Sequence, residues 1–148
     1  MNKFLDLINY SSPELTQKAL LFMRICVGLF MITEGSLKFM GGLETLKWVG
    51  SAIQNFGIHF WPTAWGFLAA SAEFFGGIGL LLGLSTRLAT IFLICVMIVA
   101  LTMHIKKGDS IAVFGFPLMM LIVFISFFIM GGGKYSLDYY FNPTSLLK

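Results

Sequence analysis

The chain has 148 residues, of which 57% are hydrophobic and only 11% are charged, and its formal net charge is +3. A soluble domain carries about 45–50% apolar and about 25% charged residues, so this chain has more apolar surface than it can bury inside itself. The excess must face lipid, which excludes a soluble domain. The small, scattered positive charge gives no indication of nucleic-acid binding.

The N-terminal region predicts two helical segments. Residues 1–10 place their apolar side chains on one helical face, which predicts a short interfacial helix lying on the membrane. The sequence then restarts at Ser11, which can cap a helix, while Pro13 suits a first helical turn and Glu14 completes a capping box. We therefore expect the first membrane span to begin near Pro13 and to enter lipid near residue 19.

Long apolar runs dominate the rest of the chain, and a spanning helix needs about 20 such residues. The third run reaches that length only if Arg87 and His104 extend toward the two surfaces. The first run is too long and too charged to be a cleavable signal peptide. We predict an all-α membrane protein, a single domain over 1–148, whose four-helix bundle spans about 19–37, 61–84, 87–104 and 111–130.

The connecting segments indicate how the bundle meets the membrane surface. Residues 41–60 form the longest connection, and the apolar pattern within 43–56 predicts a short helix lying against the mouth of the bundle. The aromatic tail after residue 134 is typical of a membrane-surface anchor. Lys and Arg are slightly more frequent on the side that holds the termini, which predicts cytoplasmic termini.

The second span carries a ridge of small residues that recur every three or four positions. Such ridges let helix backbones approach closely in lipid. Glu73 is one position off this ridge, so we expect it to point toward a partner helix. The members of the ridge are Ala69, Ala72, Gly76, Gly79 and Gly83.

Two charged residues, Arg24 and Glu73, lie inside apolar runs, where an ionised group costs ~2.5–3.5 kcal/mol on insertion scales. A rise of about 1.5 Å per residue puts Arg24 roughly 8–10 Å and Glu73 roughly 16 Å from the side that holds the termini. An arginine side chain can span this difference, so we predict a buried Arg24–Glu73 ion pair. The pair either only fastens the first two spans or lines a site for the polar group of a ligand.

A second polar group is expected near the opposite face, where Glu34, Lys38 and His104 gather. Glu34 and Lys38 are four residues apart and share a helical face. A histidine and a carboxylate at this depth could pass a proton to a quinone carbonyl, or could simply be solvated at the interface. Trp48 and Trp61 would supply aromatic walls for such a ligand.

Residue types that bind cofactors are sparse. His59 and His104 have no spacing that supports a metal site, and Cys26 and Cys95 are expected to be apolar filler, with a redox disulfide as the alternative. The chain has no flavin or nucleotide loop and no iron–sulfur cysteines. We expect no intrinsic cofactor, so any redox activity would need a partner subunit or a bound quinone.

The order of these motifs, from about Leu20 to Asp138, resembles the DoxX family. The motifs are Arg24, Gly35–Lys38, Glu73–Gly83, Thr86-Arg87, His104 and Gly132–Asp138. The resemblance implies a small four-span protein of the bacterial inner membrane. Some members of this family are subunits of quinone-linked oxidoreductases, and others accompany quinone or catechol detoxification. Many carry a glutamate early in span four, where this chain has Gly115, which puts catalytic function in doubt.

Two functional hypotheses follow. The first is an accessory subunit, not catalytic alone, that anchors or stabilises a larger membrane complex through other subunits or self-association. A redox-linked complex is one candidate. The alternative is a quinone- or small-ligand-binding component of a membrane oxidoreductase. A transporter is a more distant possibility, because a bundle of this size would need to oligomerise to form a path.

Overall fold

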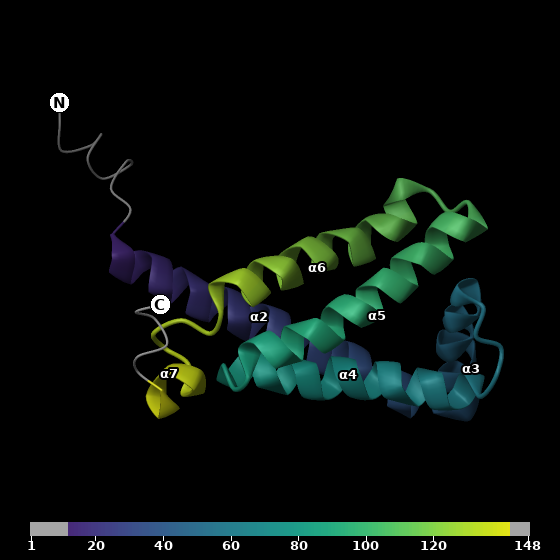
Figure 1. The fold of residues 1–148 in the computed structure, drawn as a ribbon, viewed down its shortest axis with the longest axis horizontal. Coiled ribbons are helices and arrows are strands. Elements are labelled where there is room, and N and C mark those ends of the chain that lie inside the picture. The colour runs from purple at the N-terminus through teal and green to yellow at the C-terminus, as the bar shows by residue number, and fades with distance from the viewer. Residues whose placement is uncertain (1–11, 143–148) are drawn as a thin grey trace.

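The computed structural model describes residues 12–142, and this part of the chain is helical with no strand (Figure 1). The predicted interfacial helix at residues 1–10 lies outside the described residues. Four of the helices are long and apolar enough to cross a membrane, which confirms the predicted all-α four-span bundle. The elements are α2 (Pro13–Met40), α3 (Gly42–Ser51), the 3-10 helix η1 (Ala52–Phe56), α4 (Pro62–Leu82), α5 (Thr86–Lys107), α6 (Ile111–Met130) and α7 (Leu137–Phe141).

Local signals explain where several of these helices begin and end. The side chain of Ser12, one residue after the predicted cap, accepts a hydrogen bond from the Leu15 backbone N–H, and Pro13 occupies the first turn. Helices α4 and α5 are followed by the C-cap residues Gly83 and Gly108, both in the left-handed conformation that favours glycine. The third span is longer than expected because α5 extends its basic last turn beyond His104.

Helices α2 and α4 pack backbone against backbone. A methyl group at Gly28 would lie only 2.8 Å from the carbonyl oxygen of Gly77, and one at Gly35 would lie 2.8 Å from that of Ala70. Such contacts allow dispersion forces to act along the whole helix interface. In lipid, where the hydrophobic effect does not drive helices together, this packing stabilises their association. Because Gly28 meets Gly77 and Gly35 meets Ala70, the two helices are antiparallel and their register is fixed.

The small residues predicted to form one ridge on α4 make different contacts. A side chain at Gly76 or Gly79 would overlap Leu93 or Ala89 of α5, so this part of the ridge packs against α5. Ala72 instead lines a cavity. Gly83 terminates α4, and a side chain there would overlap the Arg24 side chain of α2 and Ser136.

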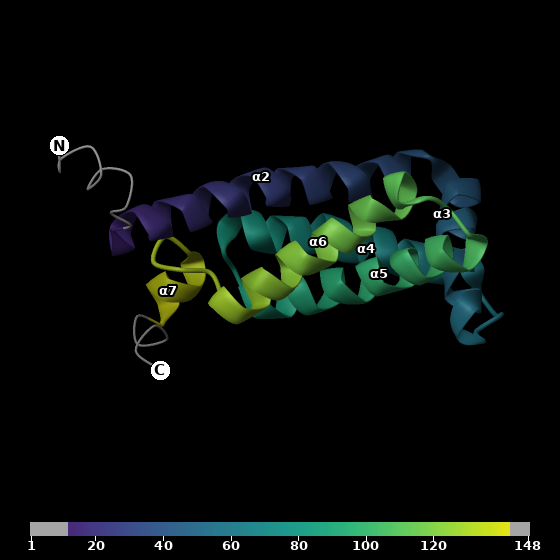
Figure 2. The same ribbon diagram turned by 90° about the horizontal axis from the view of Figure 1, so that it is seen from above.

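The bundle has two different ends (Figures 1 and 2). At one end lie α7, the turn between α4 and α5, and the start of α2. At the other end, the α5–α6 pair diverges from α4, and α3 with η1 lies across the wider side (Figure 1). The predicted short helix of residues 43–56 is therefore confirmed, as α3 followed by η1. The buried apolar core is formed by Leu20, Met31, Leu80, Leu93, Met97, Phe124 and Phe127.

Candidate functional site

The Arg24 side chain is fully buried, but it does not pair with Glu73. Its Nη1 donates to the carbonyl oxygen of Leu80 at 3.2 Å and its Nη2 to that of Tyr135 at 2.5 Å. Arg24 therefore adds a donor to the last turn of α4, where the Leu80 carbonyl also accepts from the Gly83 N–H at 3.1 Å. It also fastens the segment that follows α6.

The predicted Arg24–Glu73 ion pair is wrong, and the reason is helix register. Gly28 lies against Gly77, so Arg24 is level with the end of α4, whereas Glu73 is level with the region of Gly35. Those two levels are roughly 16 Å apart along α2 at about 1.5 Å per residue. The depth estimate failed because α2 begins well before the level at which α4 ends.

Asp138 completes the polar cluster at this end and was not singled out as a site residue from the sequence. Its carboxylate accepts hydrogen bonds from the backbone N–H groups of Ser85 at 2.6 Å and Thr86 at 2.8 Å. Its own N–H donates to the carbonyl oxygen of Gly83 at 2.9 Å. Asp138 thus caps α5 from a distant segment, which gives the Gly132–Asp138 motif a structural role.

The partner of Glu73 is Lys38. Glu73 is 3% exposed, and its Oε2 accepts a hydrogen bond from Lys38 Nζ, whose side chain is 20% exposed. Lys38 also forms an ion pair with Glu34, at 3.6 Å between Nζ and Oε2. Lys38 lies near the end of α2, and its side chain reaches inward to the middle of α4. Glu73 is therefore paired with a lysine that the sequence predicted at the opposite membrane face.

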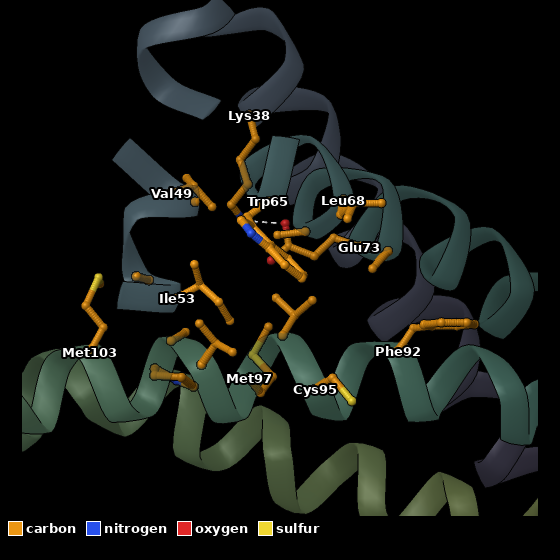
Figure 3. A pocket seen from close by; sticks show the side chains of 18 of the residues that line it. Lys38, Val49, Ile53, Trp65, Leu68, Glu73, Phe92, Cys95, Met97 and Met103 are labelled. Atoms are coloured by element: carbon orange, nitrogen blue, oxygen red, sulfur yellow. Dashed lines mark hydrogen bonds and ion pairs between the residues drawn. The ribbon is translucent and has the colours of Figure 1, made fainter. Parts of the chain in front are cut away.

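This ion pair lies at the wall of a cavity of about 700 Å³ between α3, α4 and α5 (Figure 3). Most of the cavity wall is apolar, and Lys38, Ser71, Glu73 and His104 supply the polar groups. The lining residues are Lys38, Trp48, Val49, Gly50, Ala52, Ile53, Trp65, Leu68, Ala69, Ser71, Ala72, Glu73, Phe75, Phe92, Cys95, Val96, Met97, Val99, Ala100, Met103, His104, Phe116 and Pro117.

Close packing of α3 against α4 fixes one wall of this cavity. Gly50 of α3 meets Pro62 and Gly66 of α4 so closely that a side chain at either glycine would overlap the other backbone. Lys107 at the end of α5 lies over the Trp48 ring, 5.4 Å from its centroid. The short helix is thereby fixed to α4 and joined to α5, and it covers the wider end of the bundle.

Three of the five residues predicted for a ligand or proton site line the cavity, namely Lys38, Trp48 and His104. Glu34 does not line it, although it supports Lys38. Trp61 is 75% exposed and is not among the lining residues. His104 Nδ1 lies 2.7 Å from Asp109 Oδ2, which orients the imidazole.

The residues considered for metal or redox chemistry do not form a common site. His59 is exposed, and no group of three metal-ligating side chains occurs within residues 12–142. Cys26 and Cys95 are both free, and only Cys95 lines the cavity. A side chain at Gly115 would meet nothing within 4 Å, so there is open space next to the cavity residue Phe116.

The fold and the buried polar groups define a small multi-pass membrane protein with a ligand-sized cavity. The model of the DoxX family matches residues 19–105, which is more than half of the chain. The chain belongs to the DoxX family. Comparisons with the curated proteins and with the solved structures found no match.

Proposed function

We propose that this protein binds a lipid-soluble molecule with a polar ring, of the quinone class, as a component of a membrane oxidoreductase. The observation that carries the proposal is the cavity of about 700 Å³ with a charged pair at its wall. Small-molecule sites are typically apolar clefts of about 300–1,000 Å³ with a few polar groups that orient the ligand. The cavity has this size and this composition.

The buried charges support a functional reading of the cavity. A buried ion pair is weak evidence for stability, because apolar residues of similar volume often stabilise a protein as well or better. Ionisable residues inside a membrane domain more often mark a ligand or proton site. Lys38 and Glu73 lie where α2 and α4 border the cavity, so the pair faces both the helix seam and the space that a ligand would fill.

The lining suits a flat ring with polar substituents. Trp48 and Trp65 offer aromatic surfaces from α3 and α4, and Lys38 offers N–H groups that can donate to a carbonyl oxygen. His104 contributes a second polar group from α5. In this proposal the chain binds and orients the ligand and positions protons, while electrons come from a partner subunit through the ligand.

The proposal is tested with variants that retain one of the three tryptophans, the other two being replaced by phenylalanine. Trp65 lines the cavity, and the exposed Trp61 does not, so Trp61 is the matched control. We expect decylubiquinone to quench Trp65 fluorescence saturably in detergent-purified protein and to leave Trp61 almost unchanged. Equal, non-saturating quenching of both would mean that the quinone only enters the micelle, and the proposal would fail.

A second candidate function is an accessory subunit that anchors or stabilises a larger complex. It is favoured by α6, which fully buries only Pro117, Phe124 and Phe127 and exposes a long apolar face to lipid, another subunit or a second copy. We propose the bacterial inner membrane, with cytoplasmic termini, as the setting for either function. Purification in gentle detergent separates them, because stoichiometric partner proteins without quinone support the accessory role alone.

A further inference from the structure

One oxygen of the Glu73 carboxylate has no partner within the described residues. Lys38 Nζ donates to Oε2, and no hydrogen bond of the described part of the chain reaches Oε1. In that part of the chain, the side-chain polar atoms that are both inaccessible and without a hydrogen-bond partner are Arg24 Nε and Thr86 Oγ1. Oε1 of Glu73 is not one of them, so this oxygen retains some accessible surface. Since Glu73 is 97% buried and lines the cavity, its second oxygen opens on the cavity (Figure 3).

A carboxylate oxygen without a partner requires a hydrogen-bond donor on the ligand group that contacts it. The ion pair with Lys38 requires Glu73 to be ionised, and an ionised carboxylate accepts hydrogen bonds but cannot donate them. A quinone carbonyl is also only an acceptor, so it cannot satisfy Oε1. A hydroxyl or an N–H group can, and a buried acceptor left without a donor is costly.

The surrounding charges determine which donor fits. Lys38 is already flanked by two carboxylates, Glu34 at 3.6 Å and Glu73. An anionic head would be repelled by both acids and would gain little from a lysine that they already neutralise. Across the cavity, His104 is held by Asp109, which adds no unpaired cation. A neutral donor such as a phenol is therefore favoured over a phenolate or a carboxylate.

We infer that the cavity selects ligands whose ring carries a hydroxyl donor, namely phenols and quinols over quinones and aryl ethers. In this arrangement Glu73 Oε1 accepts the hydrogen bond from the hydroxyl, and the apolar and aromatic wall holds the ring and its tail. The inference rests on the proposed function and sharpens it, because it assigns the tighter binding to the reduced member of a quinone–quinol pair.

A pair of redox-inert probes tests the inference without chemistry at the ring. 4-Nonylphenol and 4-nonylanisole share their ring and tail and differ only in whether the oxygen carries a hydrogen or a methyl group. Each is used to displace decylubiquinone from the variant that retains only Trp65. A hydrogen bond to a charged group favours the phenol by roughly tenfold or more, so we expect half-displacement at a correspondingly lower phenol concentration.

The double variant Lys38→Met/Glu73→Leu removes the acceptor without leaving either charge unpaired. Because the loss of Lys38 should weaken decylubiquinone, the quinone is used in this variant at its own half-quenching concentration. We then expect the phenol and the ether to displace it alike, with a ratio near one. A ratio near one in the parent protein would overturn the inference while leaving the proposed function intact. A preference that persists in the double variant would also overturn it. Failure of decylubiquinone and of both probes to act on Trp65 would instead refute the proposed function.

Discussion

The Lys38–Glu73 pair gives the sharpest prediction, because its two members lie on different helices and are mostly buried. Lys38→Met leaves the Glu73 carboxylate without its cation in a wall that is otherwise largely apolar. Breaking a buried pair by removing one partner costs about 3–5 kcal/mol. Near 150 residues, each kcal/mol shifts Tm by about 2–4 °C, so we expect a fall of roughly 6–20 °C.

The reverse change and the double change complete a cycle. Glu73→Leu leaves Lys38 next to Glu34 at 3.6 Å and partly exposed, so its cost should be smaller than that of Lys38→Met. Replacing both charges with apolar side chains leaves neither Lys38 nor Glu73 unpaired, and such replacements are often neutral or stabilising. Glu34 also loses Lys38, but its side chain is 34% exposed, so this loss should cost little. We expect the Lys38→Met/Glu73→Leu variant to unfold within a few degrees of the parent protein.

Thermal unfolding in detergent micelles, followed by circular dichroism at the helix band, measures all the variants under one condition. Lys47→Met is the matched control, because Lys47 is exposed on α3 and makes no ion pair among the described residues. The reasoning would be refuted if Lys38→Met behaved like Lys47→Met. It would equally be refuted if the two single effects simply added in the double variant.

The remaining predictions concern the helix seam and the tail. Gly28→Ala forces the backbones of α2 and α4 apart, so we expect a clear loss of thermal stability, whereas Gly115→Ala meets open space and should gain up to about 1 kcal/mol from helix propensity. Equal effects of the two substitutions would contradict the close seam. Asp138→Asn weakens the cap of α5 and should cost about 1–2 kcal/mol in the same unfolding experiment. An unchanged Tm would show that the tail is not fastened through this carboxylate.

Composition and apolar run length were sufficient to predict the spans and the short helix after the first one. These features depend on how much apolar surface each segment must give to lipid, which is readable along the chain. The spacing of small residues also predicted that α4 approaches another helix closely, and Gly76 and Gly79 do so against α5. The same spacing could not show that Gly77, off that ridge, meets α2.

The pairing of the charges could not be predicted, because it depends on the register between α2 and α4. That register is set by the contacts of Gly28 with Gly77 and of Gly35 with Ala70, and no periodicity along one helix reports it. Arg24 and Glu73 looked like partners by depth, yet the register brings Lys38 to Glu73 instead. The contact between Asp138 and the start of α5 is likewise a contact between segments distant in sequence.

The central claim, that the cavity is a ligand site, is tested most directly by thiol protection. Cys95 lines the cavity and Cys26 lies outside it, and both are free and exposed, so one protein contains both the probe and its control. N-ethylmaleimide labelling of membranes is followed at each cysteine by mass spectrometry, with and without decylubiquinone. We predict that decylubiquinone slows labelling of Cys95 several-fold and leaves Cys26 unchanged. Labelling of Cys95 at an unaltered rate, under conditions that saturate the membrane with quinone, would contradict the account.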